Sequence, residues 1–120
     1  MIRFKDEALC CPHCGDDYLH HKEVEVFDRL EDADVGAHVI VMRGVARFDA
    51  SMVGNPSSRR GGMRIRFYCE SCAMRPYLVI SQHKGQTLVF WEWESSGLER
   101  RASARRAQER GQHDNHRPVR

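Results

Sequence analysis

The stretch Cys11-Pro12-His13-Cys14 decides the fold, together with its counterpart Cys69-Glu70-Ser71-Cys72. Each stretch has two cysteines separated by two residues, so one tight backbone turn presents two thiolates. A structural zinc ion takes four such ligands in a tetrahedron, and its binding energy then stabilises the fold. The sequence therefore predicts one structural zinc ion per chain, bound by Cys11, Cys14, Cys69 and Cys72.

The interval between the two cysteine pairs is long. Residues 15–68 number 54, whereas the simplest zinc fingers have roughly 15–20 residues there. An inserted antiparallel β-hairpin would fill the interval. The alternative interpretation is a redox pair with unrelated cysteines, but a thioredoxin-like site needs a βαβ unit, which the sequence does not indicate. The fifth cysteine, Cys10, has no place in the set, and we expect a free thiol.

The rest of the chain to residue 97 has the patterns of short antiparallel strands. Alternation and β-branched or aromatic residues predict strands within residues 18–30, 38–42, 63–68, 76–82 and 87–93. Residues 43–50 fit neither the strand nor the helix period. Residues 54–62 form a loop with three glycines, and residues 83–86 form a hairpin loop. We expect Met63, Ile65 and Phe67 on one face of their strand, and Arg64 and Arg66 on the other.

Charge divides the chain of 120 residues into two parts. Residues 1–97 carry 12 Lys and Arg against 14 Asp and Glu, while residues 98–120 carry 7 Arg against 3 acidic residues. The first part is predicted to be a zinc-ribbon-like β domain. The second is a basic tail with good helix formers in residues 98–110 and a disordered end. With 41% hydrophobic residues the core is modest, so a metal ion would add needed stability.

The compartment is predicted from what the chain lacks. No run approaches the roughly 18 apolar residues of a membrane span. Residues 1–7 have no apolar secretory segment, and paired Cys-x-x-Cys motifs suit a reducing compartment. We therefore expect a soluble cytoplasmic protein without membrane contact.

Basic residues near the second cysteine pair suggest a partner. They lie in the glycine-rich loop, on the following strand and at the hairpin tip, where phosphate groups would be in reach: Arg59, Arg60, Arg64, Arg66, His83 and Lys84. The first hypothesis is a zinc-binding module that contacts DNA, RNA or a nucleic-acid-associated protein. The second is an adaptor that docks on another protein, such as a host protein, through an apolar and aromatic sheet face.

Catalysis is the least favoured hypothesis. Four thiolate ligands leave no open position on zinc for a reactive water. His20, His21 and His83 could each act as a general base, but no nucleophile is paired with them in the sequence. We expect no enzyme and no catalytic residue. The sequence does not indicate the oligomeric state.

The motifs together resemble small zinc-ribbon proteins of actinobacteria and their bacteriophages. The resemblance covers about residues 9–93 and rests on five stretches: residues 11–15, 18–21, 54–60, 67–72 and 82–87. These proteins are of uncharacterised function, so the resemblance implies a phage or host-cell context and no activity. It also marks the Asn55-Pro56-Ser57-Ser58-Arg59-Arg60 loop and the Gln82-His83-Lys84-Gly85 loop as surfaces to test.

Overall fold

The computed structural model describes residues 1–93, and the basic tail predicted at residues 98–120 lies outside them. Within residues 1–93 all secondary structure is β-strand, and every paired strand is antiparallel. The predicted small β-rich class is confirmed. The strands are β1 (Phe4–Lys5), β2 (Ala8–Leu9), β3 (Leu19–Asp28), β4 (Val35–Met42), β5 (Val45–Ser51), β6 (Gly62–Cys69), β7 (Tyr77–His83) and β8 (Gln86–Glu92).

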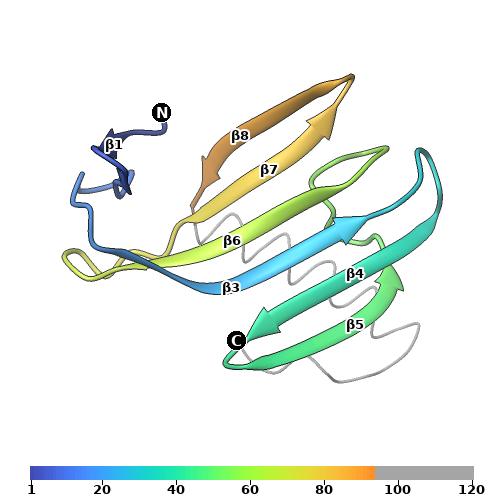
Figure 1. Cartoon of the computed structure of the whole chain (residues 1–120), viewed down its shortest axis with the longest axis horizontal. Coiled ribbons are helices and arrows are strands. Elements are labelled where there is room, and N and C mark those ends of the chain that lie inside the picture. The colour runs from blue at the N-terminus through green and yellow to red at the C-terminus, as the bar shows by residue number, and fades with distance from the viewer. Residues whose placement is uncertain (94–120) are drawn as a thin grey trace.

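Most of the described chain forms one six-stranded sheet with the order β5-β4-β3-β6-β7-β8 (Figure 1). The central pair is β3 and β6, which are the strands next to the two cysteine pairs. The β4–β5 hairpin extends the sheet beyond β3, and the β7–β8 hairpin extends it beyond β6. Strands β1 and β2 form a separate small hairpin at one end (Figure 1).

Two tight turns fix the outer hairpins. Arg43 and Gly44 both have positive φ, at 55° and 77°, and so do Lys84 and Gly85, at 50° and 80°. This conformation at both central residues matches the right-handed twist of paired strands. The Arg-Gly turn also explains why residues 43–50 fitted no single period, because they contain a turn followed by β5.

The loop between β5 and β6 carries the chain back across the sheet, and its polar groups are used internally. The Arg29 guanidinium donates hydrogen bonds to the carbonyl groups of Ala33, Ser57 and Arg60, at 3.0, 2.9 and 3.0 Å. The Ser57 hydroxyl is buried and donates to the Gln82 carbonyl at 2.8 Å. The loop is thereby attached to both β3 and β7.

The strand register sorts the side chains of the large sheet into two unlike faces. One, here called the polar face, carries two glutamates, a histidine and two arginines that are all buried: Glu23, Glu25, His38, Arg64 and Arg66. They are buried as pairs, with Arg64 Nη1 2.7 Å from Glu92 Oε1 and Arg66 Nη1 3.8 Å from Glu23 Oε1. Pairing offsets the cost of removing these charges from water.

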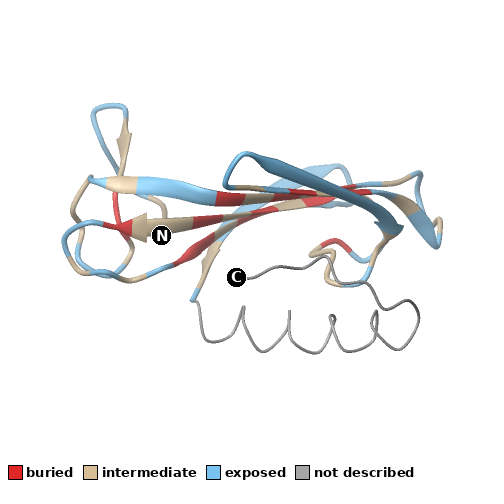
Figure 2. Ribbon diagram, turned by 90° about the horizontal axis from the view of Figure 1, so that it is seen from below, coloured by how far each residue is buried: buried red, intermediate tan, exposed pale blue. Residues whose placement is uncertain are grey.

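On the opposite side of the sheet Asp28, Gln82 and Thr87 lie at one end of their strands, and the rows next to them, here called the apolar face, carry apolar side chains. The apolar face crosses all six strands and consists of Val24, Val26, Val39, Val41, Ala46, Phe48, Met63, Ile65, Leu78, Ile80, Val89 and Trp91. None of them is buried, and Val41 and Val89 are 43% and 45% exposed. Arg64 and Arg66 do share a face as predicted, but that face is the buried one. Figure 2 shows the buried positions along the middle of the sheet and the exposed ones towards its outer strands.

Candidate metal centre

The two cysteine pairs meet at one end of the central strand pair. Cys11 and Cys14 lie in the turn that precedes β3, and Cys69 and Cys72 lie in the turn that begins at the end of β6. The pairing of Leu19 with Cys69 brings these turns together, and the Glu70 N–H donates to the Tyr18 carbonyl at 3.1 Å. In each turn the backbone closes tightly, with Gly15 and Ala73 donating to the carbonyls of Cys11 and Cys69.

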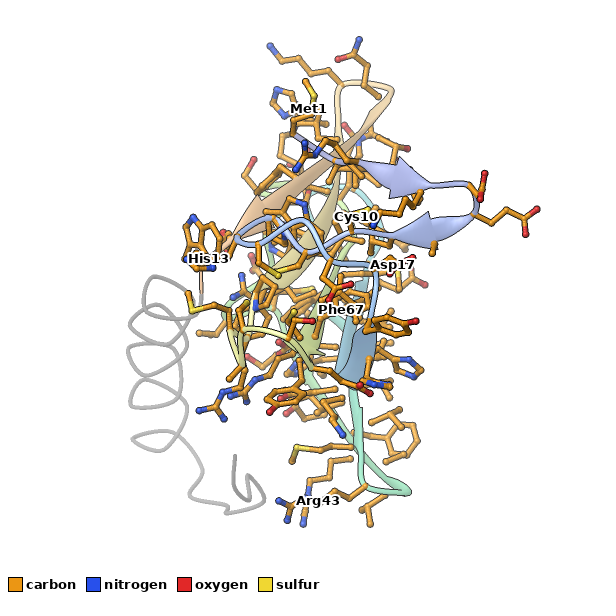
Figure 3. All side chains as sticks on the ribbon, turned by 90° about the vertical axis from the view of Figure 1, so that its left-hand side faces the viewer. Met1, Cys10, His13, Asp17, Arg43 and Phe67 are labelled. Atoms are coloured by element: carbon orange, nitrogen blue, oxygen red, sulfur yellow. The ribbon has the colours of Figure 1, made fainter. Side chains whose placement is uncertain are left out.

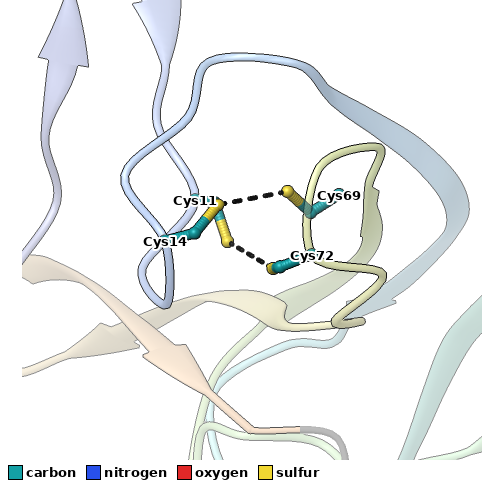
Figure 4. A group of neighbouring side chains, drawn as sticks. All are labelled: Cys11, Cys14, Cys69 and Cys72. Atoms are coloured by element: carbon teal, nitrogen blue, oxygen red, sulfur yellow. Dashed lines mark hydrogen bonds between the residues drawn. The ribbon is translucent and has the colours of Figure 1, made fainter.

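The four sulfur atoms form a cluster of the size that a single metal ion requires (Figure 4). All lie within 4.8 Å of one another. The Sγ atoms of Cys11 and Cys72 are 3.7 Å apart, and those of Cys14 and Cys69 are 3.6 Å apart. A tetrahedron with zinc–sulfur distances of 2.3 Å has sulfur–sulfur edges of about 3.8 Å. The four cysteines are therefore positioned to coordinate one metal ion.

The surroundings of the four sulfur atoms shift the pKa values of the cysteine thiols in different directions. Burial and, to a smaller extent, the neighbouring sulfur atoms of Cys69 and Cys11 together raise the pKa of Cys72 to about 12. Burial alone would also raise the pKa of Cys69, but hydrogen bonds from the backbone of Cys72 and Ser71 hold it below 9.0. The His13 N–H donates to Cys11 Sγ at 3.3 Å. The turn backbone thus supplies the hydrogen bonds that a thiolate cluster needs.

Neighbouring polar side chains connect the two turns. The Ser71 hydroxyl donates to the Asp16 carboxylate, and this bond holds the pKa of Asp16 below its usual value. His20 on β3 pairs with Glu70 in the second turn. His13 is exposed, and its ring lies perpendicular to that of Trp93 with the ring centroids 6.2 Å apart. Cys10 is buried beside the site, and its Sγ lies 3.8 Å from the Ala8 carbonyl.

The six predicted basic residues do not form one surface. Arg59 and Arg60 pair with Glu31, and Arg59 also makes two hydrogen bonds to Asp32. Arg64 is 1% exposed and Arg66 is 8% exposed, both on the polar face. His83 and Lys84 are exposed at the β7–β8 tip. The sequence identified the residues as basic and neighbouring, but it did not show that acidic partners neutralise four of them.

The predicted general bases are exposed. His20 and His21 lie on β3 and His83 lies at the end of β7. None of the three lines the cavities of about 580 and 350 Å³ found among residues 1–93. The sequence analysis did not single out His38, which is the histidine that the structure buries among charged groups.

His38 lies between two carboxylates on the polar face. Its Nε2 is 2.7 Å from Glu25 Oε2, its Nδ1 is 2.8 Å from Asp49 Oδ1, and its ring stacks on Phe27 at 4.3 Å. Burial alone would lower the pKa of His38, but the hydrogen bonds and charges of Glu25 and Asp49 raise it above 6.5. A signal for this cluster was present in the sequence as alternating charged positions on two strands, but pairing β3 with β4 was needed to connect them.

Comparison with known proteins gives no relative from which a role can be carried over. No protein-family model, curated protein or solved structure matches the chain. Within residues 1–93 there is no helix long and apolar enough to cross a membrane. The resemblance to zinc-ribbon proteins of actinobacteria and their phages therefore stays a prediction from the sequence motifs.

Proposed function

We propose that this protein is a non-catalytic module, held together by zinc, that binds another protein through its apolar face. The metal centre supports the first part. Four cysteine sulfurs at tetrahedral spacing suit zinc, and a closed set of four ligands leaves no coordination position for a substrate or a reactive water. Zinc in such a site stabilises the fold, so the binding surface lies elsewhere on the molecule.

The observation that carries the proposal is the apolar face. Monomeric proteins rarely expose a contiguous apolar patch of this kind unless it binds something. Here twelve apolar side chains cover six adjacent strands, and none is buried. The edge-to-face contact of Phe67 with Trp91, with ring centroids 5.9 Å apart, continues the aromatic surface towards the metal centre.

The chemistry and size of the face define its partner. The apolar rows offer no charge to phosphates or charged peptides, and Asp28 at their edge would repel phosphates, so the partner surface that fits them is apolar. Six strands at about 4.8 Å spacing span about 29 Å, and two same-face residues per strand at about 3.3 Å rise per residue span about 13 Å, which gives roughly 380 Å² per partner or about 760 Å² for both partners together. That total falls in the class of small, transient contacts, well below the total of 2,000 Å² or more that obligate homodimers bury. We therefore assign the face to a different protein that binds reversibly.

Nucleic-acid contact through the six predicted residues is less well supported by the geometry. Two of the arginines are buried and two are paired with Glu31 or Asp32, which leaves His83 and Lys84 at one tip. Two exposed basic residues contribute little electrostatic affinity for a nucleic-acid backbone. The basic tail at residues 98–120 lies outside the described residues.

The test compares the wild type with a variant in which Val41→Lys and Val89→Lys place charges on the apolar face. Each immobilised, zinc-loaded full-length chain is incubated with nuclease-treated bacterial lysate, and retained proteins are identified and then purified for direct binding measurements. We expect a purified partner to bind the wild type and to lose at least tenfold in affinity with the double variant. The matched control is Val45→Lys, because Val45 is 50% exposed but projects from the polar face.

Two results would contradict the proposal. The first is a partner that binds the wild type and the double variant equally well. The second is sedimentation equilibrium that shows a stable dimer which the double variant abolishes, because a second copy of the chain would then occupy the face. Zinc content and thermal unfolding of each variant establish that the substitutions leave the fold intact.

A further inference from the structure

A cavity of about 350 Å³ opens near the metal centre and is lined mainly by basic side chains. Four basic residues from four different segments line it together with one tyrosine and one glutamate: Lys22, Arg43, Arg66, Arg75, Tyr68 and Glu23. The lining has an excess of three positive charges. Only Arg66 belongs to the basic set that the sequence analysis selected, so the fold gathers this cluster from residues that are distant in sequence.

The sheet geometry places Lys22 and Arg43 at this cavity. His21 pairs with Phe67 and Glu23 pairs with Arg66, so Lys22 is the extra residue of a β-bulge in β3. A bulge redirects a side chain from the regular alternation and is common beside binding sites. Arg43 occupies the left-handed position of the β4–β5 turn, with φ of 55°. In Figure 3, Arg43 projects at the end of the molecule opposite Met1.

The second metal-binding turn positions the remaining cations. Arg75 lies between Met74, whose carbonyl accepts from the Cys69 N–H at 3.0 Å, and Pro76, whose carbonyl accepts from the Phe67 N–H at 2.9 Å. Arg66 projects from β6, only 10% of its side chain is exposed, and its Nη1 is 3.8 Å from Glu23 Oε1. One cation therefore stands at the buried end of the cavity, and Lys22, Arg43 and Arg75 are exposed around it.

We propose that this cavity binds the phosphate group of a small ligand of about mononucleotide size. Guanidinium and ammonium groups converging on one cavity favour a multiply charged oxyanion through charge-assisted hydrogen bonds. The volume lies at the small end of the roughly 300–1,000 Å³ of ligand pockets, more than a phosphate group alone fills. Tyr68 supplies an aromatic ring for the remainder of the ligand and a hydroxyl donor. The proposal does not depend on the function assigned to the apolar face.

The test measures binding of adenosine monophosphate, inorganic pyrophosphate and a 12-nucleotide single-stranded DNA by calorimetry, using the zinc-loaded full-length chain. The test variant combines Lys22→Gln with Arg43→Asn. Its matched control combines Arg47→Gln with Lys84→Asn, because Lys84 has φ of 50° and precedes a glycine as Arg43 does. Both variants lose two positive charges and keep the basic tail, so a difference between them reports on the cavity.

We expect adenosine monophosphate and pyrophosphate to lose roughly tenfold in affinity for each cation removed from the cavity, and to be little affected by the control. DNA binding should change equally in both variants. Small phosphates that do not bind at low salt, or that respond equally to both variants, would overturn the proposal. DNA that binds far more tightly than adenosine monophosphate and loses that affinity only in the test variant would also overturn it, because the nucleic-acid backbone would then be the ligand.

Discussion

At the scale of single residues, the most informative side chain is His38. It is 4% exposed, and both of its ring nitrogens have a carboxylate partner. Protonated His38 satisfies Glu25 on β3 and Asp49 on β5 at once, which explains how two carboxylates persist beside a buried aromatic ring. The polar face therefore combines charge pairing with a small buried apolar core of Phe27, Ile40, Tyr77 and Val79.

This arrangement predicts a pH dependence of stability. The pKa of His38 is raised in the folded state above its ordinary 6.5. Its stabilising contribution is therefore full below about pH 6.5 and is lost as the pH rises through the raised value. The difference in free energy of unfolding between the wild type and His38→Gln should be largest near pH 6 and shrink towards pH 9. Urea unfolding in saturating zinc measures it, and a constant difference over that range would contradict the prediction.

The roles of some single residues could be predicted from the sequence, whereas the surroundings of others could not. The four clustered cysteines were identified correctly as a set because their spacing alone limits which backbone turns can form. The environment of Arg64 was not anticipated. An arginine on an alternating strand is usually solvated, whereas Arg64 contacts Glu92, a residue 28 positions away, and its guanidinium lies 4.7 Å from the centre of the Tyr77 ring. Such partners follow from strand order, which local alternation does not encode.

At the scale of structural elements, the loop from β5 to β6, here called the strap, crosses the end of the sheet and is hydrogen-bonded to Arg29 after β3 and to Gln82 on β7. Asn55 donates to the Arg60 carbonyl at 2.9 Å and accepts from the Ser57 N–H at 2.9 Å. A Cβ on Gly61 would lie 2.7 Å from the Phe27 carbonyl oxygen. The Asn-Pro-Ser-Ser motif that the resemblance marked as a surface to test therefore has a clear structural use in holding this loop.

Arg29 should be the critical residue of this strap. Arg29→Met leaves three carbonyl groups without their donor, and we expect a loss of about 2–4 kcal/mol in the free energy of unfolding. The matched control is Arg59→Met, which removes an exposed ion pair from the same loop and should leave the thermal midpoint nearly unchanged. Chemical denaturation of both variants decides the question. Equal effects would mean that Arg29 adds no more than a surface ion pair.

Five of the six strands in the large sheet were predicted, because alternation and β-branched residues report directly on local backbone conformation, whereas β5 was not, because residues 43–50 fitted neither period. The boundaries of β6, β7 and β8 lie within about two residues of the predicted ranges. Which face of the sheet is buried was not predictable, because alternation separates two faces without ranking them. The hairpin β1–β2 was not predicted either, since two-residue strands have no period to detect.

At the scale of the whole molecule, the metal centre should decide whether the chain folds. Structural zinc contributes about 10–16 kcal/mol in small zinc domains, which matches or exceeds the 5–15 kcal/mol total stability of typical domains. Removing zinc with EDTA should abolish the cooperative thermal transition, and one equivalent of zinc should restore it. Cys14→Ser should behave like the metal-free protein, while Cys10→Ser should keep zinc. Circular dichroism and metal analysis measure both effects, and an unchanged transition without metal would refute the role.

The position of the four-cysteine cluster beside β3 and β6 also has a consequence for how quickly the sheet forms. These strands are neighbours in space, yet β4, β5 and the returning loop separate them along the chain, and closing so long a loop slows folding. A metal ion that binds both cysteine pairs early in folding would hold the adjacent ends of β3 and β6 together. The remaining residues of the two strands could then pair in order, starting from the metal end. A chain synthesised without metal would expose its unpaired apolar strands for longer, and that is the state from which β-rich proteins aggregate.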